Sequence, residues 1–195
     1  MTNTDVALIV PRTWRTTLAA VGALIILLNG NVAFAINPAP VQLFYVPFPE
    51  DQLLQGLQAI ESGGPSTAPT NPVTTYISIA AIASGTIIYY DQWENGYDAD
   101  IANPANLYSG GNPGGTQIWG DGNTANGFPP GVPSDLINAG TVIILNNDIT
   151  TTNLTAIDFD GRDKIAASRT VALTHTAWAA GSGTLLAGSV EVLDT

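Results

Sequence analysis

Beyond residue 72 the chain is divided into short apolar segments separated by turn-forming residues. The segment "VTTYISIAAIA" (73–83) alternates, which places Val73, Thr75, Ile77 and Ile79 on one face of a strand. Further strand-like segments are "TVIILNN" (141–147), "KIAA" (164–167), "RTVALTHTAW" (169–178) and "TLLAGSVEVLD" (184–194). About seven to nine short strands with regularly spaced turns predict a mainly β fold, an antiparallel β-sandwich or jelly roll, rather than a parallel α/β sheet.

The remaining segments add one helix and one long irregular region. After a β-rich run at 41–48, "PEDQLLQGLQAI" (49–60) predicts a short helix, with Pro49 at its start and two acids in its first turn. Ser84-Gly85 predicts a hairpin that joins "VTTYISIAAIA" to "TIIYY" (86–90). Between 91 and 134 only "TQIW" (116–119) predicts a strand, and so long an irregular segment is typical of a functional region.

The first thirty-five residues have the pattern of a secretory signal peptide. Arg12 and Arg15 precede the uncharged run 18–28, and Ala33-Phe34-Ala35 matches the small-x-small cleavage pattern. That run of eleven residues would span about 16 Å as a helix, against about 30 Å of membrane hydrocarbon. We therefore expect Sec-type export, cleavage after Ala35 and no membrane span in the mature chain. Residues 36–195 are expected to form a single domain of a secreted, extracellular or cell-surface protein, which could be the first module of a longer one.

The charge balance excludes nucleic acid as a partner. The chain carries 16 acidic and 5 basic side chains. Removing the leader deletes Asp5, Arg12 and Arg15, which leaves 15 acids, 3 bases and a net charge of −12. Nucleic acids and anionic membranes need a cationic footprint, which such a chain lacks. There is no cysteine, so disulfides and thiolate metal sites are excluded, and 45% apolar residues predict a folded domain.

Acidic residues gather in three turn-rich segments: "YYDQWENGYDAD" (89–100), "WGDGN" (119–123) and "DFDGRD" (158–163). Calcium takes six to eight hard oxygen ligands, so these loops predict Ca²⁺ as the one cofactor. Alternatively the acids are solvated or bonded to turn amides, with Asp160-Gly161 as a left-handed corner and Arg162 and Lys164 paired locally. The candidate calcium ligands are Asp91, Glu94, Asp98, Asp100, Asp121, Asp158, Asp160 and Asp163.

The same segments suggest two further functions. Trp93, Tyr97 and Trp119 are candidate platforms for a carbohydrate, because aromatic rings beside polar acceptors suit sugars; they could equally form a small core for the loop. A glycoside hydrolase would need two acids about 5–10 Å apart across one cleft. Its candidates are Asp91, Glu94, Asp98 and Asp121.

One histidine cannot form a conventional zinc site, and no nucleophile motif accompanies it. His175 lies in "VALTHTAW" (171–178) among residues that alternate in the manner of a strand. We expect it to be a half-buried strand residue.

The order of the motifs resembles the N-terminal region of large secreted bacterial and fungal surface proteins. In that family a YYDxWEdGY segment precedes WGDGn and DGRDkI, as "YYDQWENGY", "WGDGN" and "DGRDKI" do here. The resemblance covers about residues 41–195. In addition, "KIAASRTVALTHT" (164–176) is similar to a strand pair of IgGFc-binding-type extracellular domains. The resemblance implies a structural or adhesive β-domain rather than an enzyme, with an extracellular protein or glycan as partner.

Overall fold

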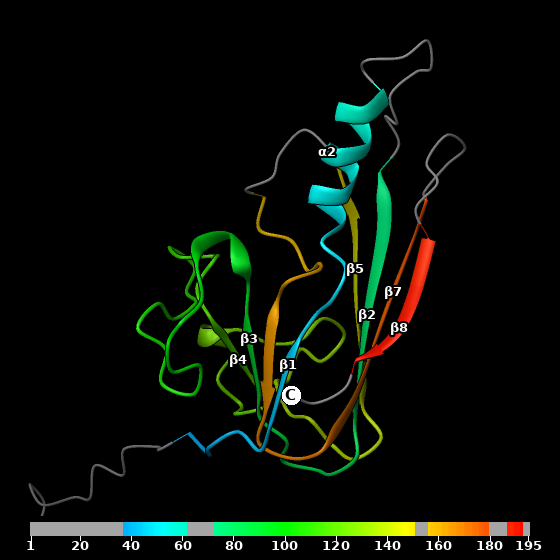
Figure 1. Cartoon of the computed structure of the whole chain (residues 1–195). Helices are drawn as coiled ribbons and strands as arrows, with labels where there is room; N and C mark the ends of the chain where they lie inside the picture. Colours follow the sequence, from blue (N-terminus) through cyan, green and yellow to red (C-terminus); the bar gives the residue numbers. More distant parts are fainter. Residues whose placement is uncertain (1–36, 62–71, 151–155, 180–186, 193–195) are drawn as a thin grey trace, which may run out of the picture. The chain divides into compact units, whose positions relative to one another are not determined.

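Two antiparallel sheets form the described part of the chain (Figure 1). The computed structural model describes residues 37–61, 72–150, 156–179 and 187–192. In chain order the elements are β1 (Gln42–Tyr45), α2 (Glu50–Glu61), β2 (Val73–Ala81), β3 (Ile88–Asp91), η1 (Trp93–Asn95), β4 (Gln117–Trp119), η2 (Thr124–Asn126), β5 (Val142–Ile149), β6 (Lys164–Ala167), β7 (Val171–Ala179) and β8 (Ala187–Val192).

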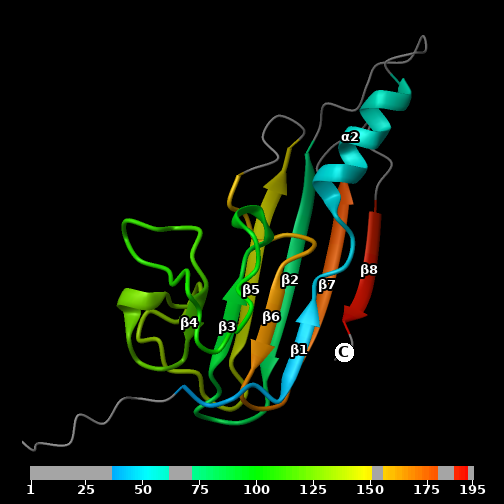
Figure 2. The same ribbon diagram turned by 60° about the vertical axis from the view of Figure 1, so that its left-hand side comes forward.

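The sheets lie face to face as a β-sandwich, which confirms the predicted fold class. Sheet A has the strand order β1-β6-β3-β4, and sheet B has the order β5-β2-β7-β8. Neighbouring strands in both sheets are antiparallel. Figure 2 shows sheet A in front of sheet B.

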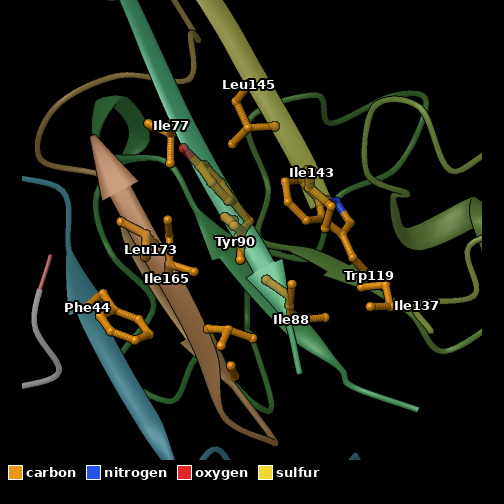
Figure 3. Packing of buried hydrophobic residues seen from close by; sticks show 14 of the residues in the cluster. Phe44, Ile77, Ile88, Tyr90, Trp119, Ile137, Ile143, Leu145, Ile165 and Leu173 are labelled. Atoms are coloured by element: carbon orange, nitrogen blue, oxygen red, sulfur yellow. The ribbon is translucent and has the colours of Figure 1, made fainter. Parts of the chain in front are cut away.

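The core fills the space between the two sheets. Burial alternates strictly along β2, so Ile77 and Ile79 point inward, as the period of two predicts. From sheet A, Tyr90 stacks on Trp119 with ring centroids 4.9 Å apart. Figure 3 shows Ile77 of sheet B and Tyr90 and Trp119 of sheet A among the side chains that meet between the sheets. The cluster contains Phe44, Val46, Ile77, Ile79, Ala81, Ile88, Tyr90, Trp119, Ile137, Ile143, Leu145, Ile165, Ala167, Val171 and Leu173.

The predicted hairpin at Ser84-Gly85 is wrong. β2 pairs with β5 and β7 in sheet B, whereas β3 pairs with β4 and β6 in sheet A. The chain therefore crosses from one sheet to the other between β2 and β3. Gly85 donates its N–H to the Ile137 carbonyl oxygen at 2.9 Å, so the turn is fixed by the segment before β5 rather than by a neighbouring strand. Turn residues signal a change of direction, but they do not determine which sheet receives the next strand.

Sheet A is covered on its outer face as well. Every residue of β3, β4 and β6 is buried. A second apolar cluster lies on this face, and Tyr89 donates its hydroxyl to the Pro38 carbonyl at 2.5 Å. The long segment after β3 supplies two of the cluster's members, so it packs on the sheet as an extra layer. The cluster contains Ile87, Tyr89, Ile101, Ala102, Ile118 and Ala166, with Leu43 against it.

The predicted helix is confirmed as α2. It begins at Glu50, directly after Pro49, and packs through Leu54 against Val73 and Ala177, with Phe48 beside them. Among the described residues, no helix has the length and apolar character needed to cross a membrane.

Candidate functional site

Five buried or half-buried carboxyl groups gather where α2 begins, where η1 lies and where the chain turns into β6. We call Glu50, Asp51, Glu94, Asp160 and Asp163 the acidic junction. Glu50 and Asp51 open α2, Glu94 lies in η1, and the two others belong to the turn before β6. All except Glu94 have at most 3% of their surface exposed. Groups of one charge sign at this density need partners or protons, because burial disfavours the ionised form.

Asp163 is the most enclosed member. It accepts the Tyr90 hydroxyl at 2.5 Å and the Asp160 N–H at 3.1 Å through Oδ2, and the Trp93 N–H at 3.3 Å through Oδ1. Burial, followed by repulsion from Asp160, raises the pKa of Asp163 well above its ordinary value. One carboxyl group thus joins β3, η1 and the turn before β6.

Trp93 connects the junction to its one arginine. Its indole Nε1 donates to Asp160 Oδ1 at 3.1 Å, and the Arg162 guanidinium carbon lies 3.1 Å from the ring centroid. Arg162 also donates from Nη2 to Asp51 Oδ2 at 2.6 Å. Burial, then repulsion from Glu94 and Glu50, raises the pKa of Asp160 to about 8. A cation–π contact and an ion pair therefore hold the junction together, but Arg162 cannot balance all its acids.

The turn before β6 differs from the predicted geometry. The left-handed residue is Arg162, with φ of 81°, and not Gly161. Glycine is needed at 161 for space instead, since a Cβ there would lie 2.1 Å from the Phe48 carbonyl oxygen. The predicted local pairing is also wrong for Arg162, whose partner Asp51 is 111 residues away.

His175 is fully buried, not half-buried as predicted. Its Nε2 lies 2.7 Å from Glu50 Oε1 and 2.9 Å from Thr75 Oγ1. Glu50 also accepts the Gly161 N–H at 2.9 Å through Oε2. The pair thus links the start of α2 to β7 and to the turn before β6, and Phe48 lies edge-on beside the imidazole.

Two buried carboxylate oxygens of the junction, Glu94 Oε2 and Asp51 Oδ1, have no hydrogen-bond partner. Burial raises the pKa of Glu94 to about 7. Both acids interact electrostatically with Asp160. A proton or a bound cation would stabilise oxygens in this position, since a lone buried carboxylate is unfavourable.

Asp91 and Asp98 form a second, separate group. Both accept from the Thr116 hydroxyl, at 3.1 Å and 2.7 Å respectively, and Asp91 Oδ2 also accepts the Asp98 N–H at 2.8 Å. Asp98 accepts the backbone N–H groups of Ala105 and Asn106. Burial raises the pKa of Asp91. These bonds fold the first part of the long segment back on itself.

Lys164 closes this group from β6. It lies opposite Asp91 in the β3–β6 register and donates its Nζ to the Asp98 carbonyl oxygen at 2.8 Å. Its predicted pairing with a nearby carboxylate is therefore replaced by a bond to backbone. Lys164 has 7% of its surface exposed, so this bond is an internal one.

The turn after β4 contains a third group. Asp135 is fully buried and accepts the N–H groups of Gly120 at 2.6 Å, Gly122 at 2.9 Å and Asn123 at 3.1 Å. Burial raises its pKa to about 6. The neighbouring Asp121 accepts from the Asn123 N–H and from the Asn126 side chain. Gly120 and Gly122 both have positive φ, which explains the "WGDG" motif as a tight turn around this carboxyl group.

The structure thus distributes the eight candidate calcium ligands over several places. Glu94, Asp160 and Asp163 meet in the junction, and Asp158 lies next to Glu94, whose Oε1 accepts the Asp158 N–H at 3.4 Å. Asp100 stands apart at the surface, where Asn103 and Ala102 donate to it. Among the described residues, no three His, Cys, Asp or Glu side chains are grouped in a way that could hold a metal ion.

The three candidate sugar platforms have different environments. Trp119 is fully buried against Tyr90, so neither face of its ring can meet a ligand. Trp93 is engaged by Asp160 and Arg162 as described. Tyr97 is 46% exposed, although its hydroxyl donates to the Arg162 carbonyl oxygen at 2.6 Å. Tyr97 is therefore the accessible ring of the three.

Comparisons of the chain with family models, with curated proteins and with solved structures found no match. The interpretation of the site therefore rests on its own geometry.

Sequence reasoning missed Glu50, Asp51 and Asp135 as members of these groups. The two helix residues were explained by the preference for acids in a first helical turn, which gives no sign of partners more than a hundred residues away. Asp135 follows "GVPS", an ordinary turn sequence. The one signal in the sequence is the pair of glycines in "WGDG", which favours a tight turn whose N–H groups need an acceptor.

Proposed function

We propose that the chain is an exported structural or adhesive β-sandwich domain of an extracellular or cell-surface protein. The observation that supports this most directly is that most of the candidate acids and one candidate ring make hydrogen bonds within the domain. Asp163, Asp160 and Trp93 hold η1 to the turn before β6, and Asp91 and Asp98 hold the following segment. Export is supported by the leader pattern at residues 1–35 and by the resemblance in motif order.

The same geometry favours this proposal over glycoside hydrolysis. A hydrolase needs two carboxyl groups facing one cleft. Asp91 and Asp98 face Thr116 and backbone amides, and each has less than 9% of its surface exposed. An open cavity of about 340 Å³ is lined by Asp100 and by none of the four candidate catalytic acids. Its lining comprises Pro40, Val41, Gln42, Leu43, Ala99, Asp100, Ile101 and Lys164.

Expression of the full chain behind its own leader in a bacterial host with a Sec pathway tests export. We expect the exported protein to begin at Ile36, because cleavage should follow Ala35. Amino-terminal sequencing and intact mass measure this directly. Ala33→Asp, which places a charge in the cleavage pattern, should retain the leader. Asn37→Asp, a charge just beyond the cleavage point, is the matched control and should be cleaved normally. Export without processing, or retention of the wild type in the cytoplasm, would contradict the proposal.

Calcium stabilisation remains part of the proposal. The unpartnered oxygens of Glu94 and Asp51 support it, because a buried carboxylate oxygen without a hydrogen-bond partner is stabilised by a nearby cation. We expect saturating Ca²⁺ to raise the melting temperature by several degrees at alkaline pH, and a chelator to reverse the change. Glu94→Gln should remove the response, whereas Asp100→Asn should preserve it, because Asp100 stands apart from the junction. If neither Ca²⁺ nor a chelator changes the melting temperature, the proposal of calcium stabilisation is wrong.

A further inference from the structure

The outer face of sheet B carries two aromatic rings in contact with each other. Tyr76 of β2 and Trp178 of β7 point to this face, because Ile77 and Ala177, which alternate with them, are buried. The ring centroids are 4.7 Å apart and the ring planes differ by 11°, so the rings are stacked. Trp178 is 39% exposed. Since Tyr76 covers one face of the indole, the exposed area lies on the other face and on the ring edges.

Polar side chains flank the two rings on the same face. In the register, Asn146 lies opposite Tyr76, while Asp148 and Trp178 lie on either side of Thr74. Asn146 and Asp148 are exposed, and Asp148 accepts the Thr74 hydroxyl at 2.7 Å. Their strand β5 is two strands from β7, or about 10 Å at about 4.8 Å per strand. We call Thr74, Tyr76, Asn146, Asp148 and Trp178 the ring platform.

The charge of this face selects the class of ligand. Among the described outward positions of sheet B there is no Lys, Arg or His, and the acids are Asp148 and Glu191. These acids belong to β5 and β8, the outermost strands, so the two middle strands carry no charge on this face. The net charge of −11 disfavours an anionic ligand, and two separated acids make no anionic cluster for a basic protein. A neutral ligand with an apolar face and many hydroxyl groups complements such a surface.

We propose that the ring platform binds a neutral β-1,4-linked polysaccharide. One sugar unit stacks on the free face of Trp178, because the C–H groups of a pyranose face pack well against an electron-rich aromatic face. Hydroxyl groups of neighbouring units bond to Asn146, which can donate and accept, and to Asp148, which accepts. This ligand class rests on the adhesive role proposed above and gives that role a partner.

Depletion of the purified chain from solution by microcrystalline cellulose and by chitin tests the proposal. At least one of these polymers is expected to bind the wild type saturably. Trp178→Ala should raise the dissociation constant at least about tenfold, because it removes the stacking surface. Tyr97→Ala is the matched control and should leave binding unchanged. It removes a ring that is 46% exposed and lies beside Tyr45 of sheet A. Heparin-agarose, an anionic polysaccharide matrix, should not retain the wild type.

The opposite results overturn the proposal. A wild type that neither polymer depletes would leave the platform to a protein partner, and wild-type affinity in Trp178→Ala, retention by heparin or loss of binding in Tyr97→Ala would each contradict it. If Trp178→Ala alters the circular dichroism spectrum, Asn146→Ala decides, because it truncates an exposed side chain. Binding should then weaken at least about threefold, and unchanged binding overturns the proposal.

Failure of this assay would be distinguishable from failure of export. The assay uses purified protein, whether or not its leader has been removed. Export is measured separately, by amino-terminal sequencing.

Discussion

The free energy of unfolding is expected to fall by an amount on the order of 5 kcal/mol as the pH rises from about 4 to about 8. Asp160 has an ordinary pKa of 3.8, and burial raises it to about 8 in the folded chain. The folded state therefore binds a proton that the unfolded state has already lost in this pH range. Stability is fully present below the unfolded pKa and is lost as the pH rises through the folded one. Glu94, whose pKa is raised to about 7, acts in the same direction.

Thermal or urea unfolding at several pH values measures this slope. Asp160→Asn keeps an acceptor for the Trp93 indole but cannot ionise, so its stability should depend much less on pH. Asp100→Asn is the control, because Asp100 lies at the surface and its pKa is lowered by the Asn103 side chain rather than raised. A wild type that is most stable near pH 8, or an Asp160→Asn profile that matches wild type, would show that the junction does not hold its acids in the protonated form.

Asp163→Ala is expected to lower the free energy of unfolding by about 3–5 kcal/mol at pH 5. The change leaves the Tyr90 hydroxyl and the N–H groups of Trp93 and Asp160 without an acceptor in a buried place. A buried polar group left unpaired lowers stability by about 1–3 kcal/mol, and few single substitutions lower it by more than about 4–5 kcal/mol. Urea unfolding followed by circular dichroism and by tryptophan fluorescence gives the value.

Two variants separate the hydrogen bonds from the volume of the side chain. Asp163→Asn retains the shape of the side chain and one acceptor oxygen. It should therefore lower the free energy of unfolding by less than half as much as Asp163→Ala. Asp158→Ala removes a half-buried carboxyl group of the same chain segment. Its side chain accepts from the Asn147 Nδ2 at 2.9 Å, so the free energy of unfolding should fall by about 1 kcal/mol. If all three variants lower the free energy of unfolding equally, the hydrogen bonds around Asp163 contribute no more to stability than that of Asp158.

The fold could be predicted from the sequence more fully than the site, and individual residues show why. The alternation of Ile77 and Ile79 predicts an inner face of β2, because burial on one side of a strand follows from its period of two. The same kind of reasoning fails for "TIIYY", where Tyr89 and Tyr90 are both buried although they point to opposite faces. The burial of Tyr89 depends on a layer contributed by residues further along the chain, which no local pattern reveals.

The site depends even more on distant pairing. The motifs "DGRD" and "WEN" identify Asp160, Asp163 and Glu94 as a notable group of acids, and the structure brings these together. Glu50, which accepts the Gly161 N–H and pairs with His175, comes from the start of α2, and its place beside these acids becomes visible only once the topology is known. Sequence also suggests that acids in Gly-rich turns are solvated, whereas Asp163 and Asp135 are fully buried here. Ligand binding at these acids stays a prediction.

The segment between β3 and β4 will tolerate change less well than surface loops usually do. Loops between strands generally accept insertions, deletions and replacement. This segment covers Tyr89 and Ile118 on the outer face of sheet A, and its own Ile101 and Ala102 are part of that cluster. Shortening it would uncover the back of the sheet, including the closely packed strands β3 and β6. In protein engineering, new sequence is therefore better grafted elsewhere, and this segment should be treated as part of the domain's interior.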